Sequence, residues 1–363
     1  MKRVMLVTNQ LAANTPGGRA QLCALNYEAL KSIYGSKLVI FQLPKRGRQG
    51  VLSFFNAFRG HIDGVTARQL SDLVSIVREN KIEKIFVDGS NLGEVVRVVK
   101  KNISNVEVTT FFHNVEARFF LGSFRTAKTL RSIGVLIANY LAERKSVKYS
   151  DKIICLSDRD SALLKSLYGR AATHTSAMAM QDRLPAVLTS IQINVEGKYA
   201  LFVGGDFYAN RSGISWYIEH VVPYISIPTY IVGRGLEDLE AMLKSDGKVK
   251  VVGAVDDVAE WYLGAQFVVA PIFDGSGMKT KVAEALMFGK KVVGTREAFS
   301  GYEDVADEVG WECETARDFI VAIEQAQSMI VEAFDPQLRQ FYEKLYSYSA
   351  ARVRIAKIID EID

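Results

Sequence analysis

The residues most able to bind an anionic ligand lie in one stretch, residues 271–295, which reads PIFDGSGMKTKVAEALMFGKKVVGT. The apolar run FVVAP that leads into it is typical of a buried parallel strand, and Gly275 and Gly277 let the backbone approach a ligand closely. A helix is predicted to follow, so that its free N–H groups and the side chains of Lys279 and Lys281 face the loop. This arrangement is typical of a phosphate site.

Glu284 adds a hydrogen-bond acceptor to the same region. It lies three residues after Lys281, on roughly the same face of the predicted helix. A carboxylate suits the two hydroxyl groups of a ribose, so phosphate and ribose together indicate a nucleotide. We expect both side chains to line a cleft and not to belong to the core. The alternative is a glycine-rich turn that serves packing alone, as in many α/β proteins.

His113 lies at the end of the apolar run VEVTTFF. Ligands of parallel sheets bind at the carboxyl ends of the strands, so an imidazole there can hydrogen-bond a sugar hydroxyl. The alternative is a structural histidine. The other histidines, His61, His174 and His220, lack a comparable context, and no spacing of His, Asp and Glu suggests a metal site.

Asn210 and Arg211 follow another predicted strand, YALFVGG, in which Gly205 leaves room for a ligand. Arginine suits phosphate because its planar fork donates two parallel hydrogen bonds. Arg234 ends the next predicted strand, TYIVGRG, and is a second candidate. The alternative for each arginine is an ion pair with a surface carboxylate.

Gly17 and Gly18 form a predicted turn after the first strand, where a helix begins. A dinucleotide-binding fingerprint needs three spaced glycines directly after the strand and an acidic residue about twenty positions later, and both are absent. A flexible turn at a helix N-terminus is what these glycines indicate, with a simple loop as the alternative.

The elements that position these residues alternate along the chain. The first half carries the apolar runs VMLVT, LVIFQL, KIFVDG, VEVTTFF and KIICLS, separated mostly by helix-length segments. The same alternation of apolar runs and helix-length segments begins again at YALFVGG. Strand, helix, strand order implies a parallel sheet with helices on both faces. Because 363 residues exceed the usual size of one domain, we expect two such units with a linker near residues 181–198.

Composition excludes several classes of protein. A hydrophobic content of 48% gives an ample core, and a formal charge of +4 is too small to indicate nucleic acid, so none is expected. No segment approaches the roughly 18 apolar residues of a membrane span, and MKRVMLVTNQ reads as a strand rather than a signal peptide. Cys23, Cys155 and Cys313 are widely spaced and odd in number, which fits a reducing cytoplasm, and none is a strong nucleophile candidate.

The glycine-rich stretch resembles the donor-site motif of GT-B glycosyltransferases, especially the family 4 branch (glycosyl transferases group 1). The residues that carry the resemblance are Gly275, Ser276, Gly277, Met278, Lys279, Lys281, Glu284, Ala285 and Gly289, followed by VVGT. The resemblance implies that Glu284 binds the nucleotide ribose. One position departs from the pattern, because Ser276 stands where many family 4 enzymes have a glutamate that meets the donor sugar, although Asp274 lies nearby and could substitute.

Other segments are similar to parts of the same family. The string His113-Asn114-Val115-Glu116 resembles the His-Asn/Asp-x-Glu segment of family 4 enzymes. The Gly17-Gly18 turn is similar to the loop by which GT-B N-terminal domains approach the donor diphosphate and the acceptor. A basic residue near the loop of Asn210 and Arg211 contacts the donor diphosphate in the resembling enzymes.

The resemblance implies a fold and a division into domains. The expected architecture is GT-B, with two Rossmann-like, doubly wound parallel-sheet domains facing each other across a cleft. Residues 1–185 are expected to bind the acceptor and residues 186–340 the nucleotide sugar. Residues 341–363 are expected to form a C-terminal helix that crosses back to the N-terminal domain. Its expected apolar face consists of Val353, Ile355, Ile358 and Ile359.

The function implied by the resemblance is sugar transfer from a nucleotide-sugar donor, with a UDP-sugar expected, to a saccharide or lipid-linked saccharide. Transfer is expected to retain configuration and to need neither metal nor cofactor, with His113, Arg211 and Lys281 as the catalytic residues. Synthesis of a bacterial surface polysaccharide or glycolipid in the cytoplasm is the expected setting. The alternatives are a nucleotide-sugar epimerase, which needs acid and base carboxylates in the cleft, and a non-catalytic nucleotide-sugar-binding scaffold.

A basic, phenylalanine-rich segment suggests where the protein works. Residues 45–59 contain Lys45, Arg46, Arg48 and Arg59 around Phe54, Phe55 and Phe58, and residues 118–148 mix basic and apolar residues in the same way. Basic amphipathic segments bind anionic membrane surfaces, which predicts peripheral contact with the inner face of the plasma membrane. The alternative is a set of ordinary helices with one buried face.

Overall fold

The computed structural model of the protein describes residues 2–11, 18–44, 51–185, 197–239, 247–330, 332 and 334–360. The chain divides into two compact units. The N-terminal unit comprises Met1–Met180 and Tyr348–Asp363, and the C-terminal unit comprises Gln181–Ser347. The expected linker lies partly outside the described residues, because 186–196 are not among them.

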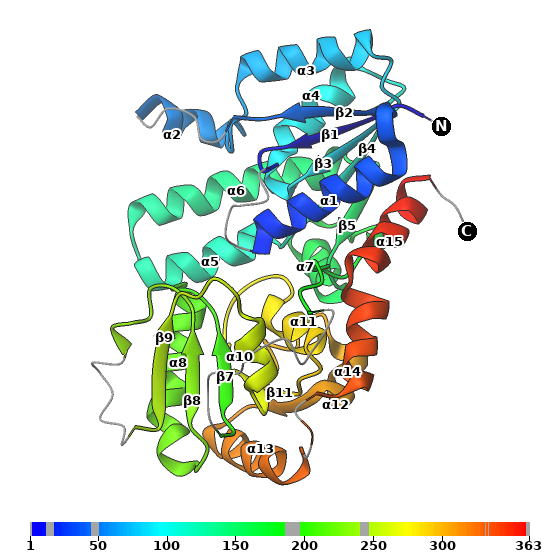
Figure 1. Ribbon diagram of the computed structural model, residues 1–363. Helices are drawn as coiled ribbons and strands as arrows, with labels where there is room; N and C mark the ends of the chain where they lie inside the picture. Colours follow the sequence, from blue (N-terminus) through cyan, green and yellow to red (C-terminus); the bar gives the residue numbers. More distant parts are fainter. Residues whose placement is uncertain are drawn as a thin grey trace. The chain divides into compact units, whose positions relative to one another are not determined.

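The N-terminal unit is built on a six-stranded parallel sheet with the order β2-β1-β3-β4-β5-β6 (Figure 1). Its strands are β1 (Val4–Thr8), β2 (Leu38–Gln42), β3 (Lys84–Asp88), β4 (Glu107–Phe111), β5 (Lys152–Cys155) and β6 (His174–Thr175). Strands β1, β3 and β5 are buried along their whole length, as expected of apolar strands covered on both faces. The sheet confirms the parallel α/β class predicted from the alternating apolar runs.

Helices connect these strands and cover the sheet (Figure 1). They are α1 (Gly18–Tyr34), α2 (Val51–Phe58), α3 (Ala67–Glu79), α4 (Gly93–Asn102), α5 (Glu116–Ala127), α6 (Leu130–Tyr149), α7 (Asp158–Tyr168) and α15 (Tyr348–Asp360), with 3₁₀ turns at Gly35–Lys37 and Ser90–Leu92. Several begin at hydroxyl side chains that satisfy free backbone N–H groups: Thr66 caps α3, Thr129 caps α6 and Ser157 caps α7.

The C-terminal unit repeats the plan with a six-stranded parallel sheet of order β12-β11-β10-β7-β8-β9. Its strands are β7 (Ala200–Val203), β8 (Thr229–Val232), β9 (Val249–Gly253), β10 (Phe267–Ala270), β11 (Val292–Thr295) and β12 (Gly310–Cys313). Its helices are α8 (Tyr208–His220), α10 (Ala259–Gly264), α11 (Thr280–Met287), α12 (Ala306–Val309), α13 (Ala316–Met329) and α14 (Pro336–Phe341), with 3₁₀ turns at Val222–Tyr224 and Glu303–Val305 and a π-helical turn at Tyr342–Tyr346. Two Rossmann-like sheets are therefore present, as predicted.

The last helix, α15, packs against α1 within the N-terminal unit (Figure 1). Ile355, Ile358 and Ile359 are buried, whereas Val353 is 49% exposed. The prediction that Val353 belongs to the apolar face is therefore wrong, because the packed face is narrower than the apolar pattern suggests. Polar contacts add to this packing, since Lys152 at the start of β5 donates to the carbonyl of Ile358 at 3.0 Å.

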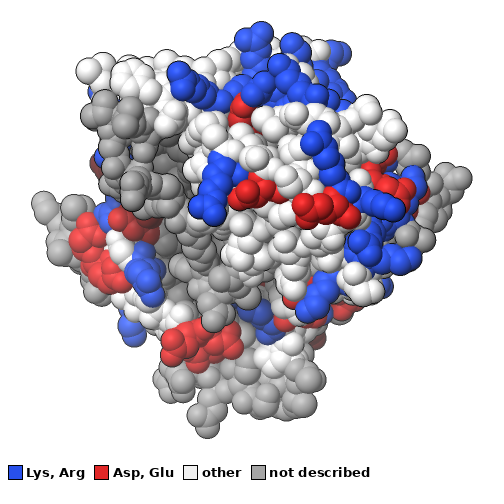
Figure 2. Space-filling view, turned by 90° about the horizontal axis from the view of Figure 1, so that it is seen from above, with Lys and Arg blue, Asp and Glu red and all other residues white. Residues whose placement is uncertain are grey.

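The surface of the protein carries its charge unevenly. Figure 2 shows Lys and Arg side chains gathered along the upper edge of that view, with few acidic side chains among them. Lys45, Arg46 and Arg48 of the basic segment predicted from the sequence lie outside the described residues. None of the helices in the described part of the chain is long and apolar enough to cross a membrane.

Candidate functional site

The glycine-rich loop between β10 and α11 has the backbone geometry that its sequence predicts. Gly275 and Gly277 have φ angles of 142° and 66°, in the region that favours glycine. The backbone N–H of Gly275 donates to the Asp274 carboxylate at 2.8 Å. The side chain of Met278 is buried and would collide with a side chain at Gly301, so Met278 is a packing residue within the loop.

Lys279 precedes helix α11 rather than lying in its first turn. It is the N-cap residue, in extended conformation. Its Nζ lies 2.9 Å from the carboxylate of Glu297 and donates to the carbonyl of Gly277 at 2.8 Å. The charge of Lys279 therefore stabilises the loop itself.

Lys281 is brought together with Asn210, from the start of α8. Its Nζ donates to Oδ1 of Asn210 at 2.8 Å and lies 4.7 Å from the centroid of the Phe202 ring. The amide of Asn210 in turn donates to the carbonyl of Gly205 at 2.9 Å. Burial lowers the pKa of Lys281 to about 7. The amino group of Lys281 is therefore largely shielded from solvent, and a bound anion would favour its charged form.

Glu284 has two hydrogen-bonding partners that the sequence did not reveal. Tyr262 donates to its Oε2 at 3.0 Å, and Arg183 approaches its Oε1 at 3.4 Å. Burial raises the pKa of this carboxyl group. Each carboxylate oxygen keeps a lone pair beyond these contacts, so the group can still accept hydrogen bonds from a ribose.

Lys281 and Glu284 differ from expectation in one respect. Their exposed fractions are 6% and 9%, so both side chains are buried. The prediction that they lie outside the core is wrong, because α11 is buried along most of its length between the sheet and its neighbours.

Arg211 is engaged by carboxylates. Its guanidinium contacts Asp206 at 2.7 Å and Asp238 at 2.8 Å, and it also donates to the carbonyl of Gly235 at 2.6 Å. The structure thus shows the alternative weighed for Arg211, an ion pair with surface carboxylates. Arg234 is exposed and forms no ion pair with another described residue.

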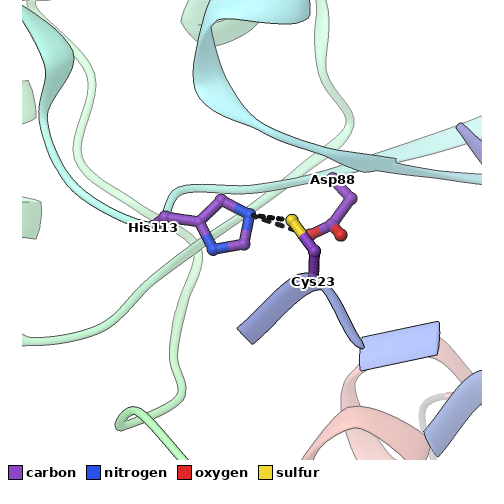
Figure 3. Close-up of side chains that lie close together, drawn as sticks. All are labelled: Cys23, Asp88 and His113. Carbon is purple, nitrogen blue, oxygen red and sulfur yellow. Dashed lines mark hydrogen bonds and ion pairs between the residues drawn. The ribbon is translucent and has the colours of Figure 1, made fainter. Parts of the chain in front are cut away.

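In the N-terminal unit, His113 lies in a buried cluster with Asp88 and Cys23 (Figure 3). Its Nε2 lies 2.9 Å from Oδ1 of Asp88 and 3.5 Å from Sγ of Cys23. Asn26 donates to the same Asp88 oxygen at 2.9 Å. Nδ1 of His113 is buried and has no hydrogen-bond partner among the described residues.

The composition of this cluster limits its chemistry. Burial and the carboxylate of Asp88 raise the pKa of Cys23, so the thiol is not a nucleophile. The hydrogen bonds to His113 and Asn26 hold the pKa of Asp88 below its usual range despite burial. The atoms of Cys23, Asp88 and His113 that could hold a metal ion lie within 4.8 Å of one another. Sequence spacing could not reveal this set, because Cys23 lies in α1, Asp88 ends β3 and His113 follows β4.

The chain around His113 carries a second buried charge system. Glu116, at the start of α5, lies 3.7 Å from the guanidinium of Arg19, and burial raises the pKa of this carboxyl group to about 7. Glu143 caps α5 by accepting from the backbone N–H groups of Glu116 and Ala117 at 2.9 and 3.2 Å. Gly18 begins α1, whereas Gly17 lies outside the described residues.

Residues 197–333 match the family described as "Glycosyl transferases group 1". These residues include the glycine-rich loop, Lys281, Glu284 and Arg211. No curated protein matches the chain in sequence.

Solved structures share the fold over the whole chain. A sucrose-phosphate synthase from Thermosynechococcus elongatus is 12% identical, with a TM-score of 0.71 and 99% of each chain covered. HepE of Anabaena, in complex with UDP-glucose, is 13% identical, with a TM-score of 0.66 and 99% of each chain covered. The lipopolysaccharide outer core galactosyltransferase WaaB is 12% identical, with a TM-score of 0.64 and complete coverage of both chains. At this identity the likeness establishes the fold.

Proposed function

Because residues 197–333 match the glycosyl transferases group 1 and the whole chain shares its fold with solved glycosyltransferases, we propose that the protein moves a sugar from a nucleotide-sugar donor to a saccharide or lipid-linked saccharide acceptor. The observation that carries this proposal is the assembly at the N-terminus of α11. There, a loop with two glycines at positive φ, the buried ammonium of Lys281 and the carboxylate of Glu284 meet within one unit. The N-terminus of α11 together with the cation of Lys281 suits a diphosphate, and the carboxylate of Glu284, three residues later, suits a ribose.

The donor in this proposal is a UDP-sugar, bound by the C-terminal unit. A structurally similar protein, HepE, has been solved with UDP-glucose. The donor-binding residues are Gly205, Asn210, Arg234, Gly275, Ser276, Gly277, Met278, Lys279 and Glu284, of which Met278 contributes its backbone. The donor sugar itself is left open by Ser276 and Asp274, because neither repeats the glutamate of the resembling enzymes.

The acceptor in this proposal is bound by the N-terminal unit, within residues 1–185. Asp88 holds Nε2 of His113, so a sugar hydroxyl would be met by Nδ1, and this buried atom would have to become accessible when the acceptor binds. Gly18, at the start of α1, would approach the same ligands. A bacterial surface polysaccharide or glycolipid is the product class that fits, made in the cytoplasm at the inner face of the plasma membrane.

The reaction in this proposal retains configuration and needs neither metal nor cofactor. The N–H groups of α11 and the ammonium of Lys281 would stabilise the charge that develops on the departing diphosphate. Arg211 would join them only after exchanging Asp206 or Asp238 for phosphate. Transfer should therefore persist in EDTA; its complete loss, restored by magnesium, would show that a metal is required.

Donor binding is the direct test of the site. UDP-, GDP-, dTDP- and ADP-sugars should be screened for a rise in melting temperature, because a ligand of the native state stabilises it. Glu284→Ala and Lys281→Ala should each weaken binding of the best donor at least about tenfold, the worth of one charge-assisted hydrogen bond.

Controls separate this result from misfolding. Lys250→Ala removes an exposed lysine of the same unit and should bind donor like the parent protein. Because Lys281 and Glu284 are buried, Glu284→Gln, which keeps the shape, and circular dichroism of every variant should accompany the titrations. Unchanged affinity in both alanine variants would refute the site assignment. Donor binding without transfer or hydrolysis would favour the scaffold alternative.

A further inference from the structure

The segment around Arg183, at the start of the C-terminal unit, is fastened to helix α11. Both carboxylate oxygens of Asp182 accept from the guanidinium of Arg339 in α14, one of them at 2.9 Å. The same guanidinium donates to the carbonyl of Met287, the last residue of α11, at 3.0 Å. The backbone N–H of Arg183 donates to Sδ of Met287 at 3.3 Å. These contacts hold the backbone of Arg183 against the end of α11.

From this position the side chain of Arg183 reaches Glu284. Its Nη2 lies 3.4 Å from Oε1 of the carboxylate, and the two side chains are 36% and 12% exposed. On the other side, the phenol of Tyr262 donates to Oε2 at 3.0 Å. The Tyr262 ring is itself stacked on the Phe288 ring, with centroids 4.9 Å apart. One cation and one neutral donor therefore fix the two oxygens of Glu284.

The hydrogen-bonding capacity that remains matches a ribose. An ionised carboxylate offers about four acceptor positions, two on each oxygen. Arg183 and Tyr262 occupy one position on different oxygens, so each oxygen keeps one acceptor position. A ribose presents two hydroxyl donors, at its 2′ and 3′ carbons. This match requires the charged form of Glu284, because protonation would turn one of the two acceptors into a donor.

The charged form of Glu284 depends on its neighbours, because burial raises the pKa of this carboxyl group. Among the described residues, the titratable groups that face it are Arg183, Lys281, Tyr262 and Tyr302. Burial holds the pKa of both phenols well above its usual range, so they stay neutral. Burial also lowers the pKa of Lys281 to about 7, and its Nζ donates to Asn210. Arg183 is thus the permanent cation of this set.

We propose that Arg183 is a positioning residue of the donor site, which keeps Glu284 ionised and oriented to accept from both hydroxyls of a ribose. The site would therefore select ribonucleotide donors over deoxyribonucleotide donors such as dTDP-sugars, which lack the 2′-hydroxyl. This inference rests on the proposed function, in which Glu284 binds the ribose. The sequence does not reveal it, because Arg183 and Glu284 are 101 positions apart.

Titration calorimetry with UDP and 2′-deoxy-UDP tests the inference on the full chain. Both ligands carry the same base and diphosphate, so the contribution of Lys281 cancels in the ratio of their dissociation constants. The parent protein should bind UDP at least about tenfold more tightly at neutral pH, the worth of one charge-assisted hydrogen bond. Arg183→Met should reduce this preference to less than about threefold, because a hydrogen bond to an uncharged group is weaker. Arg183→Lys, which keeps the charge, should retain more of it.

The pH dependence of this ratio separates positioning from a structural role. Loss of the Arg183 cation raises the pKa of Glu284 further, so in Arg183→Met the carboxyl is protonated at neutral pH and ionises as the pH rises. The preference of this variant for UDP should therefore return towards about pH 9, near the upper range known for buried glutamates. A structural role would instead weaken both ligands equally at every pH.

A matched control removes an arginine elsewhere in the unit. Arg317 is exposed on α13, and Arg317→Met should keep the ratio of the parent protein. The inference alone is overturned if the parent binds both nucleotides equally, if Arg183→Met keeps the parent's ratio at every pH, or if it weakens both ligands equally. Tighter UDP binding by Arg183→Met with an unchanged ratio would show that Arg183 only blocks the carboxylate. If the parent protein binds neither nucleotide, the proposed function is refuted together with this inference.

Discussion

At the scale of single residues, the sequence predicts candidate binding and catalytic residues but not the residues that pair with them. Lys281, Glu284 and His113 follow from residue type and from their positions at the ends of elements. Their partners come from far along the chain: Asn210 for Lys281, Tyr262 for Glu284 and Asp88 for His113. Such pairs could not be predicted, because only the packing of whole elements brings them together.

The ion-pair partners of Arg211 could not be predicted from the sequence either. An arginine after a glycine pair at a strand end suits phosphate by its type. The sequence also contains Asp206 and Asp238, but nothing in their spacing shows that both reach one guanidinium. Paired charges at an exposed site contribute little to stability, so this cluster leaves Arg211 free to exchange partners.

The titration of Lys281 gives a prediction at the residue scale. In the free protein burial lowers its pKa to about 7, so at a pH of about 8 the amine is mostly neutral. A bound diphosphate would raise that pKa again, because it favours the ammonium form. Donor binding near pH 8 should therefore take up close to one proton, measured by calorimetry in buffers of different ionisation enthalpy.

Lys290 offers a matched control for this measurement. It is also buried with a pKa lowered to about 7, but its Nζ donates to the carbonyls of Leu263 and Ala265. Lys290→Met should keep the donor-linked proton uptake, and Lys281→Met should abolish it. Uptake that survives in Lys281→Met would assign the proton to another group.

At the scale of elements, apolar runs predicted the strands well because parallel strands are buried on both faces. The run VMLVT became β1, and FVVAP and VVGT contain β10 and β11. Helix faces were predicted less well. The closing segment has apolar residues at several positions, but which of them is buried depends on the curvature and contacts of α1 and cannot be inferred from spacing.

The last helix supplies a prediction at this scale. Ile355 is 1% exposed on α15, whereas Val353, two residues earlier on the same helix, is 49% exposed. Ile355→Ala should destabilise the N-terminal unit by about 2–5 kcal/mol, the usual cost of truncating a buried aliphatic side chain. Val353→Ala should change the free energy of unfolding of this unit by less than about 0.5 kcal/mol. Urea unfolding monitored by labelling of Cys23 and Cys155 measures both, and similar values for the two variants would contradict the packing of α15.

At the scale of the whole molecule, the chain places its spectroscopic and chemical reporters in separate units. Its three tryptophans, Trp216, Trp261 and Trp311, all lie in the C-terminal unit. The free cysteines Cys23 and Cys155 are buried in the N-terminal unit. Tryptophan fluorescence therefore follows one unit, and labelling of these thiols follows the other.

These reporters test whether donor binding belongs to the C-terminal unit alone. A UDP-sugar at about a hundred times its dissociation constant stabilises the unit that binds it by about 2.7 kcal/mol. For a unit of this size the midpoint seen by tryptophan fluorescence should rise by about 5–10 °C. Labelling of Cys23 and Cys155, quantified by mass spectrometry during the same heating, should keep its midpoint.

Cys313 is the internal control, because it is a buried free thiol of the C-terminal unit. Its labelling should shift with the tryptophan signal if the shift reflects protection of that unit by the ligand, and should stay unshifted if the ligand merely quenches fluorescence. In the Ile355→Ala variant without donor, the opposite pattern is expected. Cys23 and Cys155 should be labelled at a lower temperature, and the midpoint of the tryptophan transition should stay unchanged. If the donor instead delays labelling of all three cysteines equally, the two units unfold as one, and the donor's stabilisation is shared by the whole chain.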